Sequence, residues 1–146
     1  MSLGLCGGCW AFSTTGVIAD RLCIKGYTNA QMSAEHSIQC DNTNNGCDGG
    51  MISRAFQFDK DYGVVPLACK SYRDDSIRRC SDTCDNQEKL TESMKYYIQT
   101  YQSISRGKTD DEIITEIKKV LQEDGSVSAS FKVTYLIHYI YFHLLF

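Results

Sequence analysis

The chain has 146 residues, a net charge of −3, 42% hydrophobic residues and 23% charged residues. These values are ordinary for a globular protein, and the length predicts one domain that can bury a sizeable core. The slight negative charge offers no basic surface for nucleic acid and no polybasic anchor for a membrane. We therefore expect neither of these as a partner.

Eight cysteines, all within residues 6–84, are the most informative part of the composition. This density is typical of a disulfide-bonded protein from an oxidising compartment, although a reduced cytosolic protein with ordinary thiols is the alternative. Residues 1–5 contain neither the charged region nor the apolar run of a signal peptide. If the protein follows the secretory route, we expect its targeting segment to be removed or to lie outside this sequence.

Three helices are predicted in the first half of the chain, over residues 9–25, 33–39 and 51–61. The first has an apolar stripe and is followed by Gly26, where a C-terminal cap belongs. Gly16 inside it costs about 1 kcal/mol relative to Ala, and we expect close packing to explain its presence. Ser33 is the N-cap of the second helix, and Gly63 closes the third.

The second half is predicted as a loop, a strand, a helix and a strand, over residues 67–86, 95–101, 109–125 and 126–133. Cysteines staple the loop, and β-branched and aromatic residues favour the first strand. Thr109 and Glu112 form a capping box that opens the helix. Residues 135–146 are almost entirely apolar but shorter than the roughly 20 residues of a membrane span. We interpret this tail as a core strand without its continuation, or as mistranslated sequence.

The strongest chemical signal is the segment Cys6-Gly7-Gly8-Cys9, which leads into the first predicted helix. A thiol in the first turn of a helix lies near backbone N–H groups and the positive end of the helix dipole, which favour the thiolate. The glycines let the chain turn tightly and leave the sulfur accessible. The same pattern also describes a CxxC redox site, which would require a Cys6–Cys9 disulfide. A zinc site is less well supported, because Cys80-x3-Cys84 lacks a companion pair at finger spacing.

Several segments, in the expected order, resemble the papain family of cysteine peptidases. Residues 6–10 resemble the family signature C-G-[SA]-C-[WY] and depart from it at Gly8. The later segments that resemble the family are 33–40, 45–50, 63–66 and 125–133. Residues 20–24 and 80–84 resemble its cathepsin B-like branch. The resemblance covers about residues 3–133.

The resemblance implies an α+β fold of two lobes with the substrate cleft between them. Residues 1–94 would form the helical lobe with its disulfide-stapled loops. Residues 95–146 would begin an incomplete β lobe, in which 134–146 are an aberrant apolar tail. We expect the whole of 1–146 to be a partial peptidase domain, truncated at both ends and monomeric.

The resemblance also implies the residues of the site. Cys9 is the nucleophile, which forms a thioacyl intermediate as the peptide bond is hydrolysed. Gly49 and Gly50 are the backbone strip that pairs with the main chain of the substrate, and Trp10 packs beneath the site. The implied disulfides are Cys6–Cys47, Cys40–Cys80 and Cys69–Cys84, which leave Cys23 unpaired. No metal and no cofactor are expected.

The rest of the family's catalytic machinery is not recognisable in the sequence. Six residues before the nucleophile the family has a Gln that completes the oxyanion hole, and here Leu3 occupies that position. Neither His138 nor His143 is followed by the small apolar residues that follow the catalytic histidine. We expect His36 to be a surface residue of a structural helix. The element that carries the family's catalytic Asn is absent, so we expect the chain as written to be inactive or nearly so.

Two functions are therefore open. The first is a thiol-dependent endopeptidase, and the alternative is a non-catalytic, peptide- or inhibitor-binding remnant of such an enzyme. The expected partners are peptide or protein substrates, cystatin-like inhibitors and the protein's own pro-segment. The expected location is the lysosome or vacuole, or outside the cell after secretion.

Overall fold

The computed structural model describes residues 6–28, 30–73 and 79–131. Its helices are α1 (Cys9–Ile24), α2 (Ala34–Cys40), α3 (Ile52–Asp61) and α4 (Asp110–Glu123), and its short 3-10 helices are η1 (Gly46–Asp48) and η2 (Glu92–Met94). The four predicted α-helices are confirmed, with ends that differ from the prediction by at most two residues. The predictions for Leu3, His138, His143 and the tail 134–146 lie outside the described residues.

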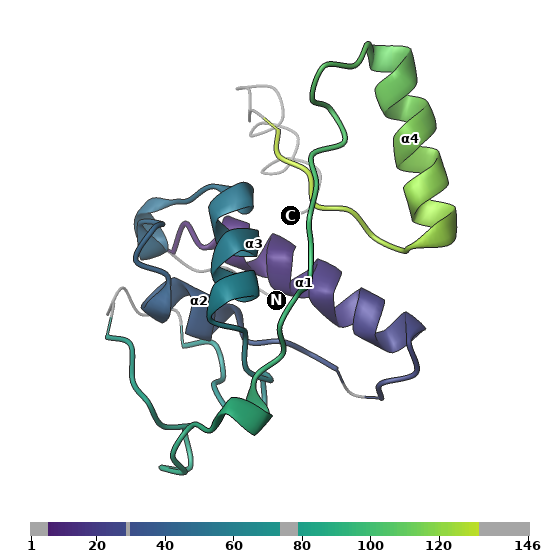
Figure 1. The fold of residues 1–146 in the computed structure, drawn as a ribbon. Helices are drawn as coiled ribbons and strands as arrows, with labels where there is room; N and C mark the ends of the chain where they lie inside the picture. Colours follow the sequence, from purple (N-terminus) through teal and green to yellow (C-terminus); the bar gives the residue numbers. More distant parts are fainter. Residues whose placement is uncertain (1–5, 29, 74–78, 132–146) are drawn as a thin grey trace, which may run out of the picture.

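Helices α1, α2 and α3 pack against one another and form the body of the described structure (Figure 1). Trp10 and Ala11 of α1, Ile38 of α2 and Ala55 of α3 are buried where the three helices meet. Each large apolar side chain buried in this way contributes roughly 1.5–3 kcal/mol to folding. A second buried cluster consists of Ile18, Met32 and Val64. This three-helix body carries the N-terminus of α1, where the candidate nucleophile lies.

Gly16 is placed differently from the expectation. A β carbon added at Gly16 would meet no atom of the described residues within 4 Å, so packing within the described structure does not explain this glycine. Gly16 is exposed on α1 in the described structure. At the end of the helix, Lys25 is the C-cap and Gly26 has a φ of 88°. Because residues with a β carbon rarely adopt this φ, Gly26 ends the helix in the position that the sequence predicts.

The predicted strand 95–101 is not a strand in the described structure. Its backbone makes one antiparallel bridge, in which Tyr96 and Val64 exchange hydrogen bonds of 2.8 and 2.9 Å. Farther along, the segment lies against α3 instead of a sheet, because the ring of Tyr101 stacks on Phe56 with the centroids 5.8 Å apart. Aromatic and β-branched residues therefore produced an extended segment here, whereas a strand also needs a partner ladder.

Helix α4 stands apart from the three-helix body and contacts none of the other described helices (Figure 1). The chain that follows it returns to α1, where Arg21 Nη2 donates to Ser126 O at 3.4 Å. The hydroxyls of Ser13 and Ser128 are also hydrogen-bonded to each other. The described part of the predicted strand 126–133 has no ladder partner. No helix among the described residues is both long and apolar enough to cross a membrane.

Candidate active site

Cys9 is the first residue of α1, and its thiol is exposed and free of any disulfide. Gly8 is the N-cap, and its carbonyl accepts from Ala11 N at 2.9 Å and from Phe12 N at 3.2 Å. The first turn of a helix presents backbone N–H groups that have no partner within the helix, and these favour a negative charge nearby. The structure thus places an accessible thiol at the N-terminus of a helix.

The glycines before Cys9 leave no room for side chains. Gly7 N donates to Cys47 O at 2.7 Å, and a β carbon on Gly7 would lie 2.5 Å from that oxygen. A β carbon on Gly8 would lie 2.6 Å from Ile38 Cδ1, so this side chain would have to move. The departure of Gly8 from the family signature therefore has a local packing reason.

Gly49 and Gly50 are held beside the start of α1. The indole of Trp10, which follows Cys9, is 2% exposed and donates to Gly46 O at 3.0 Å. A β carbon on Gly50 would lie 2.8 Å from both the Trp10 ring and the Asn44 side chain. Gly49 has a φ of 103°, which favours glycine. The two-glycine strip is thereby fixed against the residue next to the thiol.

Asn44 positions this strip, a role for which the sequence did not single it out. Its Oδ1 accepts from Met51 N at 2.7 Å, while its Nδ2 donates to Asp41 Oδ2 at 2.7 Å. Both Asp41 and Asn44 are buried. The polar residues ahead of a glycine pair were the available signal, because Asp and Asn bond to nearby backbone.

The structure contains the disulfides Cys6–Cys47, Cys40–Cys80 and Cys69–Cys84, the same pairs that the family resemblance implies. The free cysteines are Cys9 and Cys23, both exposed. Because Cys6 is bonded to Cys47, the Cys6–Cys9 disulfide of a CxxC redox site is not formed. Among residues 6–28, 30–73 and 79–131, no cluster of three His, Cys, Asp or Glu is placed to hold a metal ion.

His36 is 4% exposed, so the expectation that it lies at the surface is wrong. The packing of α2 on α3 buries it, and its ring lies beside Phe58 with the centroids 5.9 Å apart. Burial, followed by the charges of Lys70 and Lys95, lowers the pKa of His36 from 6.5 to about 4. Its Nδ1 has no hydrogen-bond partner. Within the described part of the chain, no imidazole is hydrogen-bonded to the Cys9 thiol.

Comparison with known sequences agrees with this arrangement. A family model described as papain family cysteine protease matches residues 2–142. The chain belongs to the papain family of cysteine proteases. Cathepsin B of Dictyostelium discoideum is 42% identical over 67 residues, which are 46% of this chain and 22% of that protein. A cathepsin L-like peptidase of Aedes aegypti is 35% identical over 128 residues, which are 86% of this chain and 34% of that protein.

Among solved structures, procathepsin B S9 from Trypanosoma congolense is similar, with a TM-score of 0.55 and 30% identity over 63% of this chain and 33% of that one. The chain thus spans about a fifth to a third of the length of these relatives. The predicted membership in the papain family, with cathepsin B-like relatives, is confirmed. The fold is papain-like, and the described residues form a mostly helical part of it.

Proposed function

We propose that this chain is part of a cysteine endopeptidase in which Cys9 is the nucleophile. The observation that carries the proposal is the free, exposed thiol at the first position of α1. In this proposal, Cys9 Sγ attacks the carbonyl carbon of a peptide bond and the amine leaves with a proton. Water then hydrolyses the thioacyl intermediate, which releases the acid and restores the thiol.

Gly49 and Gly50 are the proposed contact with the main chain of the substrate. Neither residue has a side chain that would block the approach of an extended peptide. A backbone pairs with such a strip through its own N–H and C=O groups, as in other strand-addition modes of peptide binding. The close approach of Gly50 to the ring of Trp10, the residue that follows Cys9, supports this role.

The 146-residue chain by itself is proposed to be inactive or nearly so. General-base activation of a thiol needs an imidazole within hydrogen-bond reach, and the described residues bring none to Cys9. A leucine, such as Leu3, also cannot donate a hydrogen bond to an oxyanion, and the loss of one such donor typically costs about 10²–10³ in rate. That the described residues bring no imidazole to Cys9 also favours the second candidate function, a peptide- or inhibitor-binding protein that does not cleave its ligand.

The proposed partners are peptide or protein substrates, cystatin-like inhibitors and a pro-segment. The Trypanosoma congolense relative is a procathepsin, and this supports the pro-segment. Three disulfides within residues 6–84 support an oxidising compartment, and we place the protein on the secretory route, in a lysosome or vacuole or outside the cell.

The proposal is tested by comparing the two free thiols at opposite ends of α1. A peptide-linked electrophile should label Cys9 at least about tenfold faster than Cys23, because the strip holds the peptide beside Cys9. Iodoacetamide, which carries no peptide, provides the reference rate at each thiol. Peptide mapping by mass spectrometry measures the rate of each reagent at each of the two thiols. If the peptide-linked electrophile and iodoacetamide favoured Cys9 over Cys23 by the same factor, this would contradict peptide binding at the strip.

The pH dependence of the iodoacetamide reaction tests the proposal that this chain by itself is inactive. Without an imidazole partner, alkylation of Cys9 should slow by more than about tenfold between pH 8 and pH 5 as the thiolate is lost. An alkylation rate at pH 5 as high as that at pH 8 would show that a neighbouring group stabilises the thiolate of Cys9. It would overturn the proposal that this chain is inactive.

A further inference from the structure

Asp41 is the C-cap of α2 and begins the loop that leads to the glycine strip, Gly49 and Gly50. It is 0% exposed, and a carboxylate is rarely buried unless it accepts hydrogen bonds. Its Oδ1 accepts from Thr43 N at 2.8 Å and from Thr43 Oγ1 at 2.6 Å. Its Oδ2 accepts from Asn44 Nδ2 at 2.7 Å. Both oxygens of this buried carboxylate therefore hold the loop.

The amide of Asn44 carries this contact to the strip. Its Oδ1 accepts from Met51 N at 2.7 Å, and its Nδ2 also donates to Met51 O at 3.4 Å. The same side chain occupies the space beside Gly50, where an added β carbon would lie 2.8 Å from it. The next residue, Asn45, donates from its backbone N to Gly49 O at 3.0 Å. The loop that follows α2 thus holds the strip at both of its glycines.

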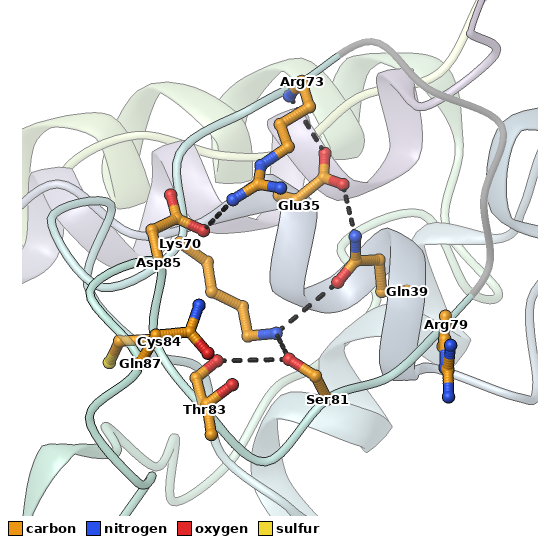
Figure 2. Close-up of a pocket in the computed structure, with 10 residues that line it drawn as sticks. All are labelled: Glu35, Gln39, Lys70, Arg73, Arg79, Ser81, Thr83, Cys84, Asp85 and Gln87. Carbon is orange, nitrogen blue, oxygen red and sulfur yellow. Dashed lines mark hydrogen bonds and ion pairs between the residues drawn. The ribbon is translucent and has the colours of Figure 1, made fainter.

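The end of α2 from which this loop starts is itself anchored. The disulfide Cys40–Cys80 joins the last residue of α2 to the loop of residues 67–86. Lys70, from that loop, donates from Nζ to Gln39 Oε1 at 3.5 Å (Figure 2). Gln39 Nε2 in turn donates to Glu35 Oε1, one turn back in α2, at 2.6 Å. A carboxylate at this helix end therefore starts from a fixed base, as the support of a binding site requires.

The hydrogen bond between Asp41 and Asn44 has only one possible direction. A carboxylate can only accept, and the amide must present its oxygen to Met51 N, so its NH₂ group faces the carboxylate. Asp41→Asn sets two N–H groups against each other, whichever way the two amides turn. Asn44→Asp sets two carboxylates against each other. Each single change thus leaves a mismatched pair of buried polar groups, which is costly.

We propose that Asp41 and Asn44 act together as a positioning pair for peptide binding, in which the buried carboxylate orients the amide and the amide sets the strip. This inference rests on the proposed contact between the strip and the main chain of a substrate. A strip that is already in place costs a peptide less to bind. Because the pair acts through the strip, it controls how a peptide is held, whereas the intrinsic reactivity of the Cys9 thiol does not depend on it.

The experiment compares the peptide-linked electrophile with iodoacetamide at Cys9 of the full chain. Asp41→Asn and Asn44→Asp should each slow the peptide-linked reagent about tenfold and leave iodoacetamide within about twofold, as expected for one mismatched buried pair. The swapped pair, which combines both changes, restores a donor facing a carboxylate and should recover most of the rate. Asn42→Asp is the matched control, because it makes the same chemical change on an exposed side chain of the same loop.

Hydrogen exchange of the Met51 amide reads the position of the strip without any peptide. This N–H donates to Asn44 Oδ1, so it should exchange faster in both single variants and return towards its original rate in the swapped pair. If the unmodified chain showed no preference of the peptide-linked reagent for Cys9, the proposed function would fail, and the Met51 amide would still decide whether Asp41 and Asn44 set the strip.

Three results would overturn the positioning pair. One is a swapped pair as impaired as the single variants, because the two side chains would then not act together. Another is an equal loss of rate for iodoacetamide and the peptide-linked reagent, which would place the effect on the thiol instead of the strip. The third is an unchanged Met51 amide in the single variants. If the single variants do not fold, the swapped pair should fold and label Cys9 like the unmodified chain, and its failure to do so counts against the pair.

Discussion

Gly50 and Gly16 show how differently two glycines of one chain are constrained. A β carbon at Gly50 would meet the Trp10 ring and the Asn44 side chain at 2.8 Å, and both of these are buried and hydrogen-bonded. At Gly16, which is exposed on α1, it would meet none of the described residues within 4 Å. The first glycine is needed for the geometry of the candidate site, whereas the second only weakens its helix.

We predict that Gly50→Ala destabilises the protein by about 1–3 kcal/mol, because the new methyl group overpacks a rigid neighbourhood. Gly16→Ala should instead stabilise it by up to about 1 kcal/mol, because alanine is the better helix former. Urea denaturation followed by circular dichroism measures both. A change of the same sign in the unfolding free energy of the two variants would contradict the assigned contacts.

At the scale of elements, α4 is the helix that depends most on its own sequence. It contacts no other described helix, and Val120 is its one buried residue among those described. Its N-terminus carries a complete capping box, in which Thr109 Oγ1 accepts from Glu112 N at 3.4 Å and Glu112 Oε2 accepts from Thr109 N at 2.7 Å. Short helices are marginal without such local contributions.

Thr109→Ala should therefore destabilise α4 by about 1 kcal/mol. The effect should be local, so amide hydrogen exchange within α4 accelerates about fivefold while α1 is unaffected. Thr115→Ala is the matched control, because its exposed hydroxyl bonds to Asp111 O in the same helix, at 2.8 Å, and caps nothing. Equal acceleration in both variants would mean that the capping box does not hold the helix.

At the scale of the whole molecule, two buried titratable groups oppose each other in the pH dependence of stability. Asp59 is 0% exposed and both of its carboxylate oxygens lack partners. Burial, and then the charge of Asp41, raises the pKa of Asp59 from 3.8 to about 7. Its contribution to stability is thus lost as the pH rises from about 4 to 7, because the native state holds a proton that the unfolded state has released.

The contribution of His36 has the opposite sign. Its pKa is lowered from 6.5 to about 4, so the unfolded state takes up a proton that the native state refuses. Stability is then lost as the pH falls from about 6.5 to 4. At about 1.4 kcal/mol per pKa unit, each group accounts for roughly 3–4 kcal/mol. Over this window the two effects nearly cancel.

We expect Asp59→Asn to become less stable as the pH falls from 6.5 to 4, since only the His36 contribution remains. His36→Gln should become less stable as the pH rises from 4 to 7, since only the Asp59 contribution remains. Denaturation midpoints across this range measure both slopes. Asp61→Asn, at an exposed carboxylate at the end of α3, is the control and should follow the unmodified chain. Parallel pH profiles for all four proteins would refute the assignment.

The helices were predictable because their signals are local. Ser33 caps α2 through its hydroxyl, Thr109 caps α4, and Gly26 follows α1, each at the position read from the sequence. The prediction of a strand at 95–101 was wrong because a strand needs a partner ladder as well as a suitable composition. Its partner is Val64 at a single bridge, and that pairing depends on where distant residues fold.

The sequence by itself determined the family, the position of Cys9 at a helix start and the glycine strip, because each depends on residues close together along the chain. Only the tertiary structure decided the burial of His36, Asp59 and Lys70 and the role of Asn44. These depend on how α2, α3 and the disulfide-tied loop pack. Burial changes the free energy of a charge by several kcal/mol, and no local pattern carries that information.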